Sequence, residues 1–220
     1  MDNAAVTCVL CAMKTEARPF VDAMRHTQVY KLRRLVIIEG SLDGKRLVLA
    51  YNAIGMKNAA VAAQLLIDRY ALSCLIMSGT AGGIDSRLLI GDTVVATETG
   101  YHDRTDETVF TAQSRLLDCF RDALKEDPPQ HPLYFGRIAT GKSFVKKGQR
   151  LDIISRIDPL CVDMESAAVA EVCKGNDVPF VAVRSISDTE TKAGLLVFIR
   201  NCLLASIHSF EVTKAFLRSQ

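Results

Sequence analysis

Two carboxylates stand where an apolar strand is expected to pass into a helix. They are Asp163 and Glu165, in the stretch VDMESAAVAEVC. The small residues that follow are typical of a tightly packed helix. Acids at such a junction can cap the helix, because its dipole favours negative charge at the N-terminus. They can also serve as groups that exchange protons with a substrate.

Three other polar or glycine-rich groups follow apolar runs. They are Glu16, the stretch SGTAGG over 78–83, and RSISD over 184–188. Functional residues of α/β sheets gather at the carboxyl ends of strands, so we expect these groups to meet in one pocket. Each has a simpler explanation when taken alone. An acid after a strand is commonly a helix cap, and SGTAGG could be a tight turn or an anion cradle.

The elements that must position these groups alternate along the chain. Strands are predicted over 7–13, 73–79, 91–99, 133–141, 160–164 and 178–188, with a hairpin between RRLVIIEG and KRLVLAYNA. Helices are predicted over 15–25, 56–70, 114–126 and 147–157, from 165 onward, and over 194–217. Continuous apolar strands indicate a sheet that is covered on both faces. We therefore predict a single α/β domain over 1–220, with a mixed central sheet flanked by helices on both faces.

Composition excludes several classes of function. The net charge is +2, from 27 basic and 25 acidic residues spread along 220 positions, and Trp is absent. This is not the pattern of a nucleic-acid-binding stripe or of a base-stacking surface. The N-terminus lacks a basic region before its apolar stretch, and no uninterrupted apolar run reaches the ~18 residues of a membrane helix. We expect neither a nucleic acid nor a membrane as partner.

The seven cysteines are an odd number without framework spacing. They predict reduced thiols and a cytoplasmic location. Cys8 and Cys11 form a C-x-x-C pair within an expected strand, where positions three apart point to opposite faces, so we interpret both as core residues. The histidines lack metal-ligand spacing. We expect no metal and no cofactor.

At the residues just described, the chain resembles the purine nucleoside phosphorylase/uridine phosphorylase superfamily, and within it the 5′-methylthioadenosine/S-adenosylhomocysteine nucleosidases. The resemblance implies a nucleoside phosphorylase-like fold and covers most of the chain. Its pieces occur in family order: AMKTE (12–16), NAIGMKNAAVAA (52–63), SGTAGGI (78–84), GDTVVATETGYHD (91–103), TGKSF (140–144), VDMESAAVAEVC (162–173) and VPFVAVRSISD (178–188).

The resemblance implies hydrolysis of the bond between adenine N9 and the ribose of a 5′-modified nucleoside, through an oxocarbenium-like transition state. By motif position, Asp188 would protonate the purine at N7. Glu165 would hold the ribose hydroxyls, and Glu16 would activate water with help from Arg184 and Thr80. The remaining implied substrate contacts are Phe144, which would stack on the base, Met13 and Met164 beside the sugar, and Gly82, Val145 and Ser187.

These roles make demands on the pocket. Asp188 must hold a proton near neutral pH, so burial must raise its pKa. Glu165 is expected to stay charged if sugar hydroxyls donate hydrogen bonds to it, and then to stabilise the cationic sugar. Asp163 is expected to have a structural role at the helix entry. His102 and Asp103, the last two residues of GYHD, fit a ribose contact and plain solvated polarity equally well.

Water is the expected nucleophile. Where phosphorylases of the resembled family carry an arginine for phosphate, this chain has Met77, and their second phosphate loop is missing. The segment DRTDETVFTAQS is shorter than in the resembled nucleosidases, which leaves the 5′ group open. The alternatives are a nucleosidase of the futalosine type, a purine nucleoside phosphorylase, and a non-catalytic nucleoside-binding protein. The resemblance also implies a homodimer and a place in methionine salvage.

Overall fold

A computed structural model describes residues 5–104, 108–143, 145, 150–189 and 195–220. Phe144, one of the expected site residues, lies outside these ranges. The described strands are β1 (Val6–Leu10), β2 (Arg25–Leu32), β3 (Leu35–Leu42), β4 (Lys45–Tyr51), β5 (Leu72–Gly83), β6 (Thr93–Tyr101), β7 (Val109–Thr111), β8 (Leu133–Thr140), β9 (Cys161–Asp163) and β10 (Phe180–Asp188). The described helices are α1 (Lys14–Ala23), α2 (Met56–Arg69), α3 (Ser114–Glu126), α4 (Arg150–Ile157), α5 (Ser166–Gly175) and α6 (Leu195–Ser219).

One mixed sheet holds these strands, as predicted. β1 pairs in parallel with β4 and β5, and β10 pairs in parallel with β5, whereas β3 is antiparallel to β4. β10 also pairs with β6, so β5, β10, β6, β8 and β9 close into a ring. β1, β4, β3 and β2 extend from this ring as an open wing. The sequence did not predict the closure, because it depends on one strand having two distant partners.

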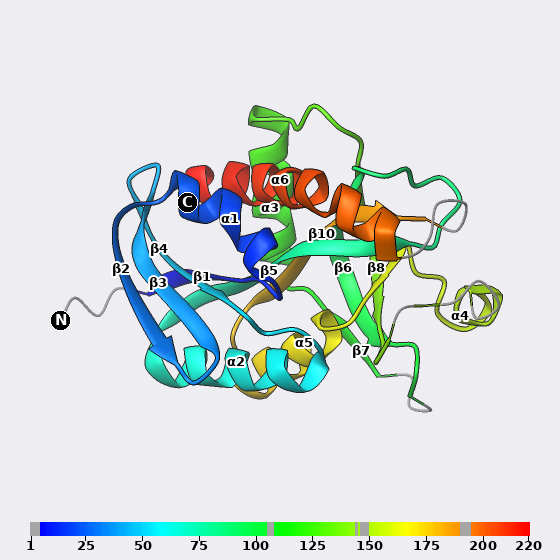
Figure 1. Ribbon diagram of the computed structural model, residues 1–220, viewed down its shortest axis with the longest axis horizontal. Helices are drawn as coiled ribbons and strands as arrows, with labels where there is room; N and C mark the ends of the chain where they lie inside the picture. Colours follow the sequence, from blue (N-terminus) through cyan, green and yellow to red (C-terminus); the bar gives the residue numbers. More distant parts are fainter. Residues whose placement is uncertain (1–4, 105–107, 144, 146–149, 190–194) are drawn as a thin grey trace.

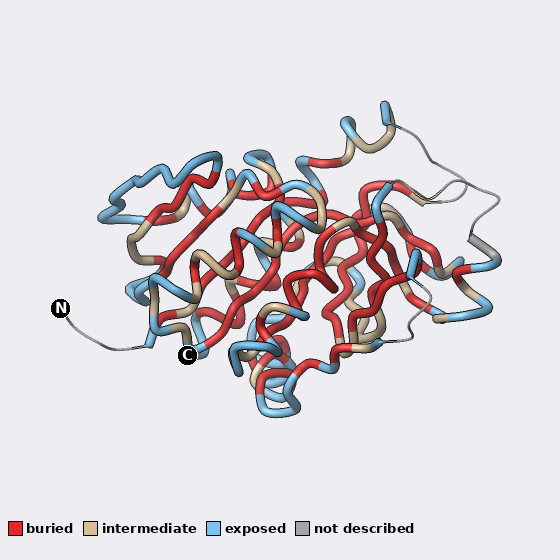
Figure 2. The backbone as a smooth tube through the Cα atoms, turned by 90° about the horizontal axis from the view of Figure 1, so that it is seen from below, coloured by how far each residue is buried: buried red, intermediate tan, exposed pale blue. Residues whose placement is uncertain are grey.

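Helices cover both faces of the sheet, which confirms the predicted layering. Helices α1, α3 and α6 lie together on one face, and α2 and α5 lie on the other (Figure 1). Each face has its own apolar core, and the buried residues concentrate in the middle of the sheet (Figure 2). Cys8 belongs to one core and Cys11 to the other, and both are fully buried. They are core residues on opposite faces of β1, as the strand pattern predicted.

The strand β2 was missed by the sequence analysis. All eight of its residues are exposed, and its sequence, RHTQVYKL, carries no alternation of buried and polar positions. It exists as an edge strand because its backbone pairs with β3. Side-chain patterning cannot reveal a strand of this kind, since neither of its faces is buried.

The interpretation of SGTAGG as a turn or an anion cradle is wrong. Residues 78–83 are the end of the long strand β5, paired with β10. The lack of a side chain at Gly79 allows other side chains to approach the strand closely, and no turn is formed here. A Cβ atom at Gly79 would overlap the Glu16 carboxylate and would lie 2.7 Å from Arg184 Nη1. Only glycine lets these two side chains pass so close to the strand.

Helix α6 differs from the expectation that no apolar stretch of the chain is long enough for a membrane helix. Although Arg200 interrupts its apolar run, the helix is 25 residues long and includes an 18-residue stretch of mean hydropathy 1.5, enough by length and composition to cross a membrane. In this fold α6 packs along β5 and β10. Its first half nevertheless leaves several large side chains exposed: Leu195, Leu196, Ile199, Leu203 and Leu204.

Candidate active site

A cavity of about 150 Å³ opens at the carboxyl ends of the central strands. Most residues expected at the site line it together. Arg184 does not; it lies beneath the cavity and is fully buried. The expected residues that line the cavity are Met13, Glu16, Thr80, Gly82, Val145, Met164, Glu165, Ser187 and Asp188.

Glu16 sits in the first turn of α1 and is almost fully buried. Its Oε1 accepts hydrogen bonds from Thr80 N at 2.8 Å and Thr80 Oγ1 at 2.9 Å. Its Oε2 accepts one from Met13 N at 2.9 Å. The carboxylate therefore caps α1 and is also tied to the wall of the cavity. Three donors hold this carboxylate in a fixed orientation. A general base needs such a fixed position, because it must lie within hydrogen-bond reach of the water that it deprotonates.

Glu165 comes directly before α5. Its Oε1 accepts a hydrogen bond from Gly55 N at 2.8 Å, and its Oε2 lies 3.4 Å from Arg184 Nη2. The pKa of Glu165 is raised to about 7: burial is the main cause, Arg184 opposes it, and the nearby carboxylates Asp163 and Glu16 also contribute to the rise. Without hydrogen bonds from sugar hydroxyls, the pKa of Glu165 lies near neutral pH, because desolvation disfavours its charged form. That the hydroxyls of a bound ribose keep it charged stays a prediction.

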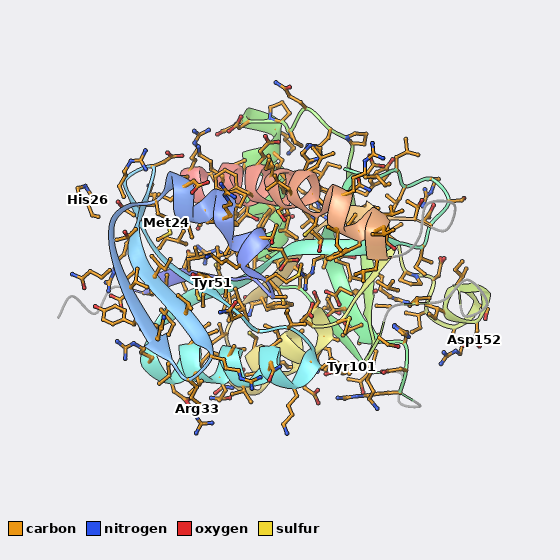
Figure 3. The ribbon with its side chains drawn as sticks, in the orientation of Figure 1. Met24, His26, Arg33, Tyr51, Tyr101 and Asp152 are labelled. Carbon is orange, nitrogen blue, oxygen red and sulfur yellow. The ribbon has the colours of Figure 1, made fainter. Side chains whose placement is uncertain are left out.

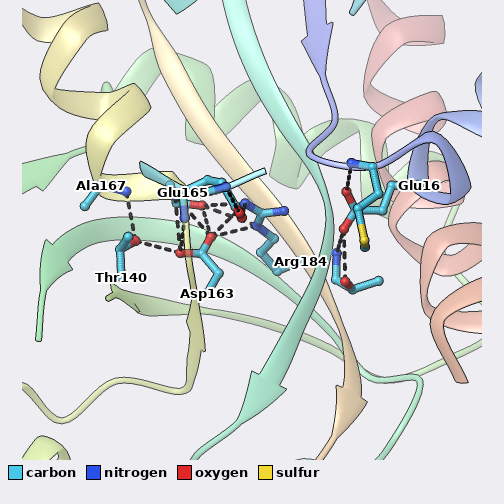
Figure 4. Close-up of polar contacts among 10 residues, drawn as sticks. Glu16, Thr140, Asp163, Glu165, Ala167 and Arg184 are labelled. Carbon is cyan, nitrogen blue, oxygen red and sulfur yellow. Dashed lines mark hydrogen bonds and ion pairs between the residues drawn. The ribbon is translucent and has the colours of Figure 1, made fainter. Parts of the chain in front are cut away.

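Asp163 organises the entry to α5 (Figure 4). Its carboxylate accepts hydrogen bonds from Ser166 N at 3.2 Å, from the Ser166 hydroxyl, and from Thr140 Oγ1 at 2.6 Å. It also accepts a hydrogen bond from Arg184 Nε at 2.8 Å. An acid that caps a helix and anchors a buried cation has the structural role expected for Asp163.

Arg184 connects the acidic groups. Its guanidinium pairs with Asp163 at 2.8 Å and with Glu165 at 3.4 Å (Figure 4). Burial alone would lower its pKa, but Asp163, Glu165 and Glu16 outweigh burial and raise it. Nη1 has no hydrogen-bond partner among the described residues. One fixed cation among several acids leaves the cavity negative, a field that stabilises a positive charge developing on a bound molecule.

Asp188 ends β10 and is buried at the cavity wall. The Ser187 hydroxyl lies 3.0 Å from Asp188 Oδ1 and 3.2 Å from the Ala81 carbonyl. A hydroxyl has one proton to donate. If Asp188 is ionised, Ser187 can donate to it. If Asp188 holds a proton, it can donate to Ser187, which then donates to Ala81. The contact is thus satisfied in both states, as a group that exchanges a proton requires.

The sequence analysis missed part of the cavity wall. Ile54 lies in the loop between β4 and α2, and it belongs to the NAIG motif, which could have revealed it. Phe198 comes from the first turns of α6 and has no local signal, because its place depends on how that helix docks. Ser143, beside Phe144, was also missed. The other unexpected lining residues are Ala12, Ala81 and Val162.

No group of three or more His, Cys, Asp or Glu side chains in the described ranges is arranged to hold a metal ion. His26 projects from the wing, in β2 (Figure 3). His131 and His208 stack on one another with ring centroids 4.0 Å apart. His102 is buried, but neither it nor Asp103 lines the cavity.

Comparison with known proteins assigns the chain to a family. Residues 7–218 match the model of the phosphorylase superfamily. A curated relative, the 5′-methylthioadenosine/S-adenosylhomocysteine nucleosidase of Actinobacillus succinogenes, is 36% identical over 202 residues, covering 85% of this chain and 87% of its own. The chain belongs to this nucleosidase family of the phosphorylase superfamily. The expected resemblance is confirmed.

Solved structures agree with this nucleosidase family. The enzyme of Neisseria meningitidis, in complex with methylthio-immucillin-A, superposes with a TM-score of 0.90 at 28% identity, covering 99% of this chain and all of that one. The futalosine hydrolase of Helicobacter pylori gives a TM-score of 0.89 at 24% identity, covering 98% of both chains, which shows the shared fold alone. The predicted nucleoside phosphorylase-like fold is confirmed as well.

Proposed function

We propose that this enzyme hydrolyses the N-glycosidic bond of 5′-thio-modified adenine nucleosides and releases adenine. The single observation that carries the proposal is the placement of Glu16, Glu165 and Asp188 around one cavity above the buried Arg184. The related proteins are named for action on 5′-methylthioadenosine and S-adenosylhomocysteine. These two nucleosides are therefore the proposed substrates.

The three carboxyl groups divide the reaction. Asp188 gives its proton to N7, so that adenine leaves as a neutral base. The C1′–N9 bond breaks with both electrons going to the purine, and the ribose becomes cationic. Glu165, once ionised, accepts hydrogen bonds from the ribose hydroxyls and stabilises that cation. Glu16 takes a proton from the water that bonds to C1′. One water is consumed, and each proton lost by one group is gained by another.

Water is favoured over phosphate by the surroundings of β5. Met77 is fully buried in an apolar core and offers no charge to an anion. The net negative cavity would also repel a phosphate dianion. A purine nucleoside phosphorylase therefore fits less well. A purely nucleoside-binding protein fits less well too, since binding alone does not require Glu16 to be held by three donors.

The test is adenine release from 5′-methylthioadenosine with and without added phosphate. The expected result is the same rate in both buffers, together with 5′-methylthioribose rather than its 1-phosphate as product. Release that depends on phosphate would assign the chain to the phosphorylases. Saturable nucleoside binding without release would favour the binding protein.

The 5′ group remains part of the proposal. We propose relaxed selectivity between a methylthio and a homocysteine tail, because the segment DRTDETVFTAQS, which is longer in the resembled nucleosidases, leaves less of the chain to enclose a tail. Values of kcat/KM for 5′-methylthioadenosine, S-adenosylhomocysteine, 5′-deoxyadenosine and futalosine would test this. A preference above about a hundredfold, or about 3 kcal/mol, for one thioether over the other would contradict it. A strong preference for futalosine would establish the futalosine-type alternative.

A homodimer is proposed as the working form. Ile54 lines the cavity and also a shallow groove at α2 and α5, whose other apolar residues include Met56, Ala60 and Val172. A second copy seated on this groove would cover the cavity mouth and complete its wall. Solution mass tests this: a dimer is expected, and a fully active monomer would contradict it.

A cytoplasmic place in methionine salvage is also proposed. The location is supported by seven cysteines present as free thiols, six of them buried. Fractionating cells and titrating thiols in the unfolded, unreduced protein would test the location. Deleting the gene should make 5′-methylthioadenosine accumulate.

A further inference from the structure

The strand that carries Asp188 is irregular at the catalytic position. Along β10, Ile186 pairs with Ala81 and Asp188 pairs with Gly82, so two steps on β10 correspond to one step on β5. Ser187 is the extra residue. Such a bulge bends a strand and re-aims the side chains beside it, and it leaves the extra residue out of the ladder. Here it coincides with the point where Asp188 reaches the cavity.

The backbone carbonyl of Ser187 receives its hydrogen bond from helix α6. Asn201 Nδ2 donates to Ser187 O at 3.1 Å and to Val197 O, one turn earlier on its own helix, at 2.9 Å. Both partners are carbonyl oxygens, so the amide can face them only with its NH₂ group. Its two protons are then both used, and the side chain is fixed between helix and bulge.

This contact acts on Asp188 through one peptide group. The Ser187 carbonyl and the Asp188 amide belong to the same plane, so holding the carbonyl sets the direction in which the Asp188 side chain leaves the backbone. Phe198, which lines the cavity, lies three residues before Asn201 and hence on the same side of α6. The neighbouring Arg200 is exposed.

We propose that Asn201 is a positioning residue: it holds the bulge at Ser187 so that Asp188 points at the purine. This inference rests on the proposed nucleosidase function. It adds a link that the chemistry alone does not require, between the docking of α6 and the protonation of the leaving group.

The experiment compares two leaving groups in one variant. Asn201→Leu has nearly the same size but no donor. The substrates are 5′-methylthioadenosine and the 4-nitrophenyl riboside with the same 5′-methylthio group, whose nitrophenolate leaves without a proton. A shift of an ångström or less can cost up to about a hundredfold. We expect kcat for the adenine nucleoside to fall about 10- to 100-fold, and kcat for the nitrophenyl riboside to stay unchanged.

The ratio of the two rates is protected from loss of folded protein, because unfolding lowers both by the same factor. Arg200→Ala, one position away, should leave both rates unchanged. Added to Asp188→Asn, Asn201→Leu should lower the residual rate no further, since a group that acts through Asp188 has nothing left to position.

An unchanged rate ratio, or an equal loss in the Asp188→Asn background, would overturn the positioning role while the nucleosidase assignment stood. A wild-type enzyme that releases no adenine would overturn the proposed function and this inference with it.

Discussion

The cavity has two unlike regions, a polar floor and an apolar rim. The floor consists of buried groups that hydrogen bonds join or fix: Glu16, Asp163, Glu165, Arg184 and Asp188. The rim, Ile54 and Phe198, comes from a loop and a helix start and is partly exposed. The charged groups of the floor can stabilise or transfer charge during the reaction, whereas the apolar residues of the rim can cover a bound substrate. We therefore expect changes in the floor to alter kcat and changes in the rim to alter KM and selectivity.

Removing the charge of Glu16 should give the largest loss. Glu16→Gln keeps an oxygen for the Thr80 donors but cannot take a proton from water, so kcat should fall about 10²- to 10⁴-fold. Adenine release and a melting curve are the measurements. Glu39→Gln is the control, because Glu39 is a half-buried, hydrogen-bonded carboxylate outside the cavity. Turnover near the wild-type rate in Glu16→Gln would remove Glu16 from the mechanism.

Asp188→Asn should cost a comparable factor by a different route. The amide still offers hydrogen bonds to the purine but has no proton to transfer, so binding should persist while departure slows by about 10²- to 10⁴-fold. A crystal soaked with 5′-methylthioadenosine should then contain the intact nucleoside. If this variant cleaves the nucleoside at the normal rate, another group assists the leaving purine.

Arg184→Met tests how much the floor depends on its one cation. It would remove the cation that pairs with the buried acids Asp163 and Glu165, and breaking a buried ion pair costs about 3–5 kcal/mol of unfolding free energy. Urea unfolding at pH 8 should show this loss, and it should shrink at low pH as the acids take up protons. The control, Arg137→Met, breaks a partly exposed pair with Glu98 and should cost less. Equal losses would mean that the floor is not specially dependent on Arg184.

Removing the titratable group of Glu165 should change stability and activity in opposite directions, and its effect on stability should be smaller than that of Arg184→Met. Its pKa rises from 4.5 to about 7 on folding. The folded state therefore holds a proton that the unfolded state has lost, and stability falls as the pH rises from about 4.5 to 7. Glu165→Gln avoids this cost. At pH 8 it should be more stable than wild type by about 1–3 kcal/mol, yet nearly inactive.

The same group sets the pH dependence of the wild type. Activity needs the ionised form, so kcat/KM should rise with pH through about 7. The stability prediction is tested by melting curves of wild type and Glu165→Gln at pH 5 and at pH 8. The stability gain of Glu165→Gln should vanish at pH 5. A gain of the same size at both values would show that burial of the charge is not its cause.

The floor was largely readable from the sequence, and the rim was not. Glu16, Glu165 and Asp188 each follow an apolar run, so the rule that strand ends converge brought them together. Helix α3 was predicted to the residue, because the apolar positions of SRLLDCFRDALKE repeat with helical spacing. These features depend on local pattern and on one rule of topology.

What failed depends on contacts between distant segments. β2 has no buried face, and the glycines of 78–83 are set by the side chains of Glu16 and Arg184 rather than by a turn. The ring closure needs β10 to pair on both edges. Phe198 and Asn201 acquire their roles only when α6 docks against the end of β10. None of these contacts can be predicted from the local sequence around the residues that make it.

Truncating the rim should give the smallest effect and the sharpest contrast with the floor. Ile54→Ala removes apolar surface that is 55% exposed in the single chain, so the lost contact with a bound 5′ tail is worth about 1 kcal/mol. KM for 5′-methylthioadenosine should rise severalfold with kcat unchanged, whereas 5′-deoxyadenosine, which lacks the thioether, should be unaffected. Val61→Ala, an exposed apolar truncation outside the cavity, is the control. An equal loss for both nucleosides, or a fall in kcat, would place Ile54 with the floor and end the distinction between the two regions.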